Sequence, residues 1–386
     1  MTVPVNTRSD VLAAVDHLRA ALSGAGPAVR PALAPAPPLA LGPADDDPRD
    51  PTTVAVSSSG STGEPKTVLL PASALLASAA ATHDRLGGPG HWLLPLPAQH
   101  VAGVQVLIRS LVARSTPVVL DPQASFTAEA FAAGTAQLPA GRRYTSLVPT
   151  QLGRLLDDTG GRAALRTFDA VLLGGAAAPA PLLERAAAAG VHVVTTYGMS
   201  ETSGGCVYDG RALDGVRVRL DDDGRVRLSG PTLARGYLGA PAATAAAFVD
   251  SLTGREFVTS DQGRWLDDGR LAVVGRLDDV LITGGVNVAP AAVEAVAHRV
   301  PGVAEVVVVG VPDATWGQRV VAAVVVEGSI EPDGLLADLR RAVTAELGAP
   351  AAPRELVLLN GLPVRGPGKP DRAAVLRIVT ERLEKS

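Results

Sequence analysis

The chain is poor in several residue types, and each scarcity excludes a class of protein. Its 386 residues include one cysteine, Cys206, so an intrachain disulfide is impossible and a reducing compartment, the cytoplasm, is expected. Aromatic residues make up 3% of the chain and the net charge is −4, which argues against nucleic acid as a partner. No segment approaches about 18 uninterrupted apolar residues, so we expect no membrane span and no targeting segment.

Lysine is also scarce, although basic residues are not. Among 35 lysines and arginines, only Lys66, Lys369 and Lys385 are lysines. Lys66 in "TGEPK" and Lys369 in "RGPGKPDR" stand near glycines. A compact ammonium differs chemically from a planar guanidinium, so both glycine-containing loops are predicted to bind anions.

The stretch "SSSGSTGEPK", residues 57–66, is the first of these loops. It is not a Walker-type loop, because Pro65 occupies the place of the second glycine. Its backbone N–H groups, hydroxyls and lysine could still surround a polyphosphate. Taken alone, the same residues are more typical of a surface turn.

The order of patterns along the chain predicts its architecture. Residues 9–22 have helical periodicity after a Ser/Asp cap, and eight prolines from Pro27 to Pro51 predict an extended surface connector. From Thr52 onward, short apolar runs alternate with helical patterns, which is typical of an α/β fold with a parallel sheet. Residues 216–276 change to short strands with polar turns, and a compact α+β unit follows.

We therefore predict a large α/β N-terminal domain with parallel-sheet layers and a small β subdomain, followed by a small mobile α+β C-terminal domain. The predicted bounds are 1–51 for a short helix and proline-rich connector, 52–277 for the N-terminal domain and 278–386 for the C-terminal domain. Polar or glycine-rich turns follow the apolar runs "TVAV", "FDAVLL" and "VHVVTT", and such loops converge on one crevice in an open parallel sheet. In "YGMSET", Glu201 could hold Mg²⁺ on a polyphosphate or simply cap a helix.

Five motifs occur in a fixed order: "SSSGSTGEPK", "YGMSET", "TSDQGRW", "GRLDDVLITGGVNVAPAAVE" and "GPGKPDR". Together they resemble the adenylate-forming superfamily of acyl-CoA synthetases, luciferases and peptide-synthetase adenylation domains. The resemblance covers about residues 52–386, and most of the family's first subdomain is missing. This short form, with "SLVPTQL" and "HVAG", is most similar to the family's 2-succinylbenzoate:CoA ligases of menaquinone biosynthesis.

The resemblance implies an acid:thiol ligase that uses ATP and Mg²⁺ to join a small carboxylic acid to AMP and then transfers the acyl group to CoA. It implies catalytic roles for Lys369, Glu201 and His100, with Glu201 binding Mg²⁺ near Thr62. Lys369 would bridge the attacking carboxylate and the α-phosphate, where charge gathers. The implied nucleotide-binding set is Ser57, Ser58, Ser59, Gly60, Ser61, Thr62, Gly63, Lys66, Gly174, Gly175, Ala176, Tyr197, Gly198, Met199, Ser200, Thr202, Asp261 and Arg276.

Within this set, the resemblance assigns residues 174–176 to the adenine, with Tyr197 stacked on it, and Asp261 and Arg276 to the ribose. In the second half-reaction the C-terminal domain would turn about Asp278, withdraw Lys369 and bring Gly284 and Gly285 to the pantetheine tunnel. The implied acyl-binding residues are His100, Ser146, Thr150 and Gly198. Polar groups are needed there because a buried second carboxylate must be paired.

Three positions depart from the family pattern: Thr67 follows the loop lysine, Ser260 replaces a glycine, and Pro370 follows Lys369. None of these removes a reactive group. Other readings remain open, namely another carboxylic acid:CoA ligase, an adenylation domain that loads a carrier protein, or a nucleotide-binding module without turnover. A binding module would have no chemical need of Lys369. The oligomeric state is also open, with a homodimer as one alternative.

Overall fold

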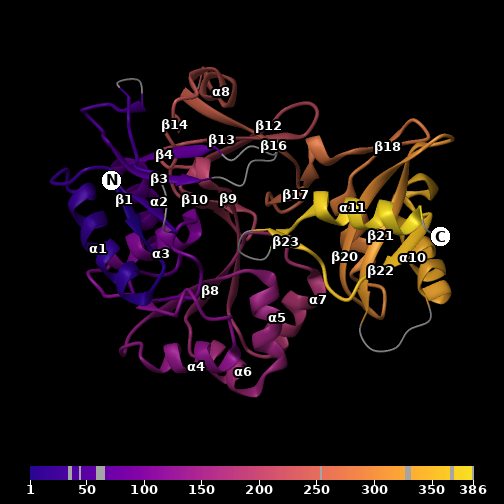
Figure 1. The fold of residues 1–386 in the computed structure, drawn as a ribbon, viewed down its shortest axis with the longest axis horizontal. Helices are drawn as coiled ribbons and strands as arrows, with labels where there is room; N and C mark the ends of the chain where they lie inside the picture. The colour runs from indigo at the N-terminus through magenta and orange to yellow at the C-terminus, as the bar shows by residue number, and fades with distance from the viewer. Residues whose placement is uncertain are drawn as a thin grey trace. The chain divides into compact units, whose positions relative to one another are not determined.

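The computed structural model describes residues 1–33, 37–42, 45–57, 66–252, 254–326, 332–365 and 369–384 (Figure 1). Its contacts divide the chain into two compact units. The first comprises Met1–Ala178, Arg185–Arg219 and Arg227–Thr259, and the second comprises Pro179–Glu184, Leu220–Val226 and Ser260–Ser386. Residues 260–277 thus group with the C-terminal part, whereas the hinge at Asp278 remains a prediction.

A seven-stranded sheet has the order β11-β10-β9-β8-β7-β5-β6, in which β6, β5, β7, β8 and β9 are parallel. Its central strands β5, β7 and β8 are buried at nearly every position, as expected for a parallel sheet covered on both faces. The predicted α/β architecture is confirmed. The strands are β5 (His91–Leu94), β6 (Val118–Val119), β7 (Arg143–Leu147), β8 (Ala170–Leu173), β9 (Val193–Met199), β10 (Gly204–Tyr208) and β11 (Arg211–Ala212).

The helices predicted between these strands are present. They are α2 (Ala72–Arg85), α3 (Val101–Val112), α5 (Pro149–Asp157) and α7 (Ala180–Ala188). The structure adds α4 (Ala128–Ala136) and α6 (Thr159–Leu165), which are short and lack a clear apolar periodicity. Each of these two begins at a side-chain cap, Thr127 for α4 and Asp158 for α6.

The N-terminal segment is more integrated than a surface connector. Helix α1 (Arg8–Leu22) begins at Thr7, which forms a capping box with Asp10, so the predicted Ser/Asp cap lies two residues too late. Strand β2 (Arg30–Ala32), inside the proline-rich segment, pairs in parallel with β1 (Thr2–Pro4). The preceding Val29 is fully buried.

Strand β3 (Thr52–Ser57) does not belong to the parallel sheet, contrary to the expected alternation. It pairs antiparallel with β4 (Thr67–Pro71), and β14 (Gly236–Tyr237) completes a separate three-stranded sheet. The reason is the short connection, because a parallel crossover needs a dozen or more residues whereas a hairpin needs few. Strands β3 and β4 therefore form an antiparallel pair.

The predicted antiparallel subdomain is a sheet of order β12-β13-β16-β15, in which β17 also pairs with β16. Its elements are β12 (Arg217–Leu220), β13 (Arg225–Ser229), β15 (Phe248–Ser251), β16 (Gly254–Trp265) and β17 (Leu271–Arg276), and helix α8 (Pro241–Ala247) precedes β15.

The second unit contains an α+β core. Side chains alternate along β20 (Val303–Asp313): Val306 and Val308 pack with α9 (Pro290–Ala297) and α10 (Pro332–Leu347), whereas Val307 and Val309 pack with α11 (Arg372–Leu383). Helices thus cover both faces of the sheet β19-β18-β21-β20. Its other strands are β18 (Leu281–Thr283), β19 (Val286–Val288), β21 (Gly317–Val326) and β22 (Glu355–Leu358), and a hairpin of β23 (Val364–Arg365) and β24 (Lys369–Pro370) follows.

Candidate active site

The carboxyl ends of four neighbouring strands carry most of the predicted site residues of the first unit. The order β9-β8-β7-β5 places Tyr197, the loop at 174–176, Ser146 and the segment leading to His100 along one edge of the sheet. Ligands bind at this edge in open α/β sheets because the loops there converge. The order of strands therefore brings together residues that lie up to about a hundred positions apart in the sequence.

Two glycines at this edge are required by close packing. A Cβ atom on Gly174 would lie 2.4 Å from Thr196 Oγ1, and one on Gly198 would lie 2.1 Å from the Gly204 carbonyl oxygen. Gly175 has φ = 83°, a region that side chains disfavour. Glycine at these positions therefore allows neighbouring strands to approach closely at the edge where the nucleotide and the acyl group are expected to bind.

A short 3₁₀ turn, η2 (Ser200–Thr202), presents Glu201 after β9. The Thr202 hydroxyl is used inside the turn: it accepts a hydrogen bond from the Met199 N–H at 3.0 Å and lies 2.8 Å from the Gly204 carbonyl. Ser203 has φ = 54°, and its carbonyl accepts a hydrogen bond of 2.7 Å from Gln105 of α3. The turn is therefore held by its own Thr202 hydroxyl and by Gln105 of the neighbouring helix α3.

Glu201 is buried and is held by the segment before and within β14. Its backbone oxygen accepts a hydrogen bond from Ala234 N at 2.8 Å, and its Oε1 accepts one from the Tyr237 hydroxyl at 3.0 Å. Burial and the neighbouring Glu201 carboxylate raise the pKa of Tyr237 far above its ordinary value, so the phenol stays a donor. The Lys66 Nζ lies 4.8 Å from the centre of the Tyr237 ring. Sequence reasoning missed Tyr237, because "ARGYLG" has no periodicity or charge pattern that marks it.

The donor set around Glu201 fits Mg²⁺ bound largely through substrate phosphates. Magnesium commonly takes one or two carboxylates and fills its other positions with phosphate oxygens and water. Within the described residues, no group of three or more His, Cys, Asp or Glu side chains could hold a metal alone. Glu201 is one buried carboxylate, and its partner Tyr237 lies under Lys66, so it could be the single carboxylate of such a site.

Only the ends of the predicted phosphate loop can be placed. Ser57 is exposed at the end of β3 and pairs with Thr67, and Lys66 follows the loop directly. The predicted residues Ser58, Ser59, Gly60, Ser61, Thr62 and Gly63 lie outside the described residues, so the pairing of Thr62 with Glu201 remains a prediction.

The predicted acyl-binding residues lie near the ends of β5 and β7. His100 is the N-cap residue of α3, although its side chain does not cap the helix. Ser146 on β7 is buried, and its Oγ has no hydrogen-bond partner among the described residues. Thr150 is half-buried in the first turn of α5. A buried hydroxyl without a partner is rare in folded proteins and is consistent with a ligand-binding position.

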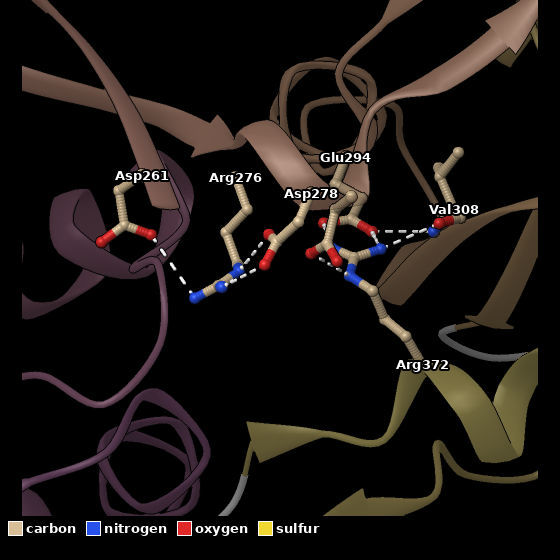
Figure 2. Close-up of polar contacts among 7 residues, drawn as sticks. Asp261, Arg276, Asp278, Glu294, Val308 and Arg372 are labelled. Carbon is tan, nitrogen blue, oxygen red and sulfur yellow. Dashed lines mark hydrogen bonds and ion pairs between the residues drawn. The ribbon is translucent and has the colours of Figure 1, made fainter. Parts of the chain in front are cut away.

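Asp261 and Arg276, the predicted ribose residues, lie opposite each other on β16 and β17 in the second unit. Arg276 Nη1 is 3.7 Å from Asp261 Oδ1, and two nitrogens of Arg276 donate to the Asp278 carboxylate at 2.8 and 2.6 Å (Figure 2). Hydrogen bonding to Asp278 raises the pKa of Arg276. Burial acts to raise the pKa of Asp278, but the contacts with Arg276 outweigh burial and lower it. The predicted hinge residue thus shares one arginine with a predicted ribose residue.

A second ion-pair group in Figure 2 was not anticipated. Arg372, three residues after Lys369, donates to both oxygens of Glu294 at 2.6 and 2.8 Å and to the Val308 carbonyl at 2.8 Å. It also lies 3.5 Å from Asp279, beside the hinge residue. The start of α11 is therefore fastened to α9 and β20. Only the juxtaposition of distant segments reveals this, since Glu294 and Arg372 are 78 residues apart.

The two predicted CoA-binding glycines form a tight hairpin turn. Gly284 and Gly285 have φ values of 56° and 78° between β18 and β19, as a two-residue turn of this kind requires. Lys369 lies in β24, where its backbone pairs with Arg365. The first unit thus gathers the Glu201, Tyr197, Ser146 and His100 regions, and the second gathers Asp261, Arg276 and Asp278.

Comparison with known proteins places this arrangement in a class. The model of the AMP-binding enzyme family matches residues 7–264, and that of the AMP-binding enzyme C-terminal domain matches residues 292–369. The chain belongs to the family of AMP-binding enzymes. The resemblance drawn from the five sequence motifs is confirmed.

Individual relatives are more specific. The chain is 49% identical over 333 residues to a probable 2-succinylbenzoate–CoA ligase of Mycobacterium tuberculosis. This match covers 86% of this chain and 85% of the relative. A Bacillus subtilis o-succinylbenzoate CoA synthetase (MenE) in complex with the acyl-adenylate intermediate OSB-AMP matches with a TM-score of 0.73 at 28% identity, over 84% of this chain and 69% of that chain. The same enzyme with ATP and a magnesium ion matches with a TM-score of 0.71 at 28% identity, over 84% and 70% of the two chains.

Within the described parts of the chain, none of the helices combines the length and apolarity that crossing a bilayer requires.

Proposed function

We propose that this chain is an AMP-forming acid:thiol ligase that activates 2-succinylbenzoate with ATP and transfers the acyl group to CoA, a step of menaquinone biosynthesis. The observation that carries the proposal is the extended similarity to the mycobacterial ligase, which is 49% identical over 333 residues. The Bacillus subtilis enzyme, matched with its acyl-adenylate and with ATP and magnesium, supports the same substrates and cofactors.

The reaction has two balanced steps. First, an oxygen of the succinyl carboxylate attacks the α-phosphorus of ATP, the bond to the β-phosphate oxygen breaks, and pyrophosphate leaves. We assign Lys369 to the negative charge that gathers in this step, and Ser57–Lys66 to the β- and γ-phosphates. When bound, Mg²⁺ would neutralise phosphate charge, and Glu201 is the carboxylate that would hold it. In the second step the CoA thiol releases its proton to solvent, its sulfur attacks the acyl carbon, the bond from that carbon to the AMP phosphate oxygen breaks, and AMP leaves.

The aromatic carboxylate of the substrate remains an anion throughout and must be recognised. We assign His100, Ser146 and Thr150 to this task. The unpartnered Ser146 hydroxyl supports the assignment, because a buried donor at the end of β7 could hydrogen-bond a carboxylate oxygen. We further propose that the reaction takes place in the cytoplasm and without nucleic acid.

A thioester-formation assay over a panel of carboxylic acids, with ATP, Mg²⁺ and CoA, tests the proposed function. We expect 2-succinylbenzoate to be converted far faster than benzoate or medium-chain fatty acids. Faster conversion of hexanoate or benzoate would contradict 2-succinylbenzoate as the substrate, but it would still be consistent with adenylate-forming chemistry. Transfer only to a carrier protein or an amine would overturn CoA as the acceptor.

A further inference from the structure

We propose that Tyr237 positions the Glu201 carboxylate for Mg²⁺ and links it to Lys66 of the phosphate loop. This rests on the proposed function, since it concerns how the chain binds ATP with magnesium. No sequence motif or assigned site residue includes Tyr237.

The first observation is that one short segment holds Glu201 at two places. Ala234 N donates to the Glu201 backbone oxygen at 2.8 Å, and the Tyr237 hydroxyl donates to Oε1 at 3.0 Å. A carboxylate with a fixed backbone and a hydrogen bond to Oε1 has little freedom to rotate. Its second oxygen is then held in a defined direction, which a metal ligand requires.

The second observation concerns register. Strand β14 pairs with β4 so that Tyr237 lies opposite Val68, two residues after Lys66. Tyr237 is almost completely buried, and its ring lies beneath the Lys66 ammonium at 4.8 Å from ring centre to Nζ. One aromatic side chain therefore touches the lysine next to the phosphate loop with its ring and the metal carboxylate with its hydroxyl.

The role differs from ordinary core packing. Tyr237 also packs against Phe248 with ring centres 5.9 Å apart, and phenylalanine would preserve that contact. Only the hydroxyl reaches Glu201. A purely structural tyrosine would affect folding, whereas a positioning tyrosine affects the dependence of ATP binding on Mg²⁺.

The test is calorimetric titration of ATP into the full chain, without carboxylic acid, at a series of Mg²⁺ concentrations. In Tyr237→Phe we expect the Mg²⁺ concentration that gives half of the gain in ATP affinity to rise about tenfold or more, the effect of losing one hydrogen bond to a charged group. ATP affinity without Mg²⁺ should change less than twofold. The control is Tyr144→Phe, which removes a buried hydroxyl that donates to the Leu86 and Gly88 carbonyls in the same unit.

Glu201→Gln gives a second, independent route. Alone it should abolish most of the Mg²⁺ dependence, and in that background Tyr237→Phe should add almost nothing, because both changes act on one interaction. The inference is overturned if Tyr237→Phe matches Tyr144→Phe, if it weakens ATP equally with and without Mg²⁺, or if its effect persists in full with Glu201→Gln. Wild-type binding of ATP that is indifferent to Mg²⁺ would overturn the proposed cofactor use and with it this role of Tyr237.

Discussion

Among single residues, His83 and Arg109 show what burial does to charge. Arg109 is buried on α3 and lies 5.2 Å from the centre of the Trp92 ring, and its Nη2 donates to the Tyr208 hydroxyl at 3.2 Å. The His83 ring packs against the same Trp92, with ring centres 6.2 Å apart. Burial and the nearby Arg109 charge lower the pKa of His83 to about 4, and the nearby Asp84 opposes this only partly. His83 is therefore neutral in the folded protein at physiological pH.

The first prediction is a pH dependence of stability. Between about pH 4 and the unfolded value of 6.5, the unfolded chain takes up a proton on His83 that the folded chain refuses, so stability falls as pH falls through this window. His83→Leu should reduce the slope of the unfolding free energy against pH in this window, by an amount that corresponds to the uptake of at most one proton. Urea unfolding at pH 4.5, 5.5, 6.5 and 7.5 measures it, with the offset at pH 7.5 reporting packing alone. An unchanged slope would contradict a neutral His83.

The second prediction concerns His100 at the start of α3. His100→Ala should raise the KM for 2-succinylbenzoate about tenfold or more and change the KM for ATP little, because a hydrogen bond to a charged group is lost only on the acyl side. Steady-state kinetics with each substrate varied gives the comparison. His17→Ala, an exposed histidine of α1, is the control. A selective rise in the KM for ATP would move His100 out of the acyl site.

At the scale of elements, turns set the geometry that the chemistry needs. The β18–β19 turn depends on two glycines with positive φ, and a Cβ on Gly284 would lie 2.9 Å from Trp316. The 3₁₀ turn η3 (Leu277–Asp279) is held by two arginines. Arg276 pairs with Asp278, and Arg372 pairs with Asp279. A change of backbone there would have to release the Arg276–Asp278 pair.

The third prediction therefore separates the backbone of Asp278 from its charge. Asp278→Pro fixes φ near about −65° and should leave adenylation largely intact while thioester formation drops at least tenfold. Asp278→Asn removes the charge and keeps the backbone free, so it should retain both half-reactions within a few-fold. Pyrophosphate exchange measures the first step, and CoA consumption from supplied acyl-adenylate measures the second. If both steps survive in the proline variant, the hinge lies elsewhere in "GRLDDV".

At the scale of the whole molecule, two half-reactions share one chain. The fourth prediction follows from the proposal that Lys369 serves only adenylation. Lys369→Ala should reduce acyl-adenylate formation by about 10² to 10³, as expected for the loss of one charge-stabilising group. Conversion of supplied acyl-adenylate and CoA to thioester should continue at nearly the wild-type rate, and Lys385→Ala should affect neither step. An equal loss in both steps would rule out separate roles for two conformations.

Much of the fold followed from local patterns. Apolar runs of four to seven residues marked β5, β7, β8 and β9, and helical periodicity marked α2, α3 and α10. The patterns failed where an element depends on its partner: β3 reads like a strand of the parallel sheet but pairs with β4, and α11 was missed although Val375 and Val379 are buried. The motifs named Glu201, Asp261 and Arg276, and two of them end on Glu294 and Arg372 without predicting that these residues pair. No motif contained Tyr237.

The sequence by itself determined which segments are strands, helices and glycine turns, and which side chains are chemically suited to phosphate, metal and carboxylate. These properties are local, since periodicity, capping and φ preference act within a few residues. Only the tertiary structure decided that the Tyr237 hydroxyl meets Glu201 across 36 positions and that Arg372 meets Glu294 across 78. Such contacts arise from strand register and helix packing, which close long loops of chain and leave no mark in any short stretch of sequence.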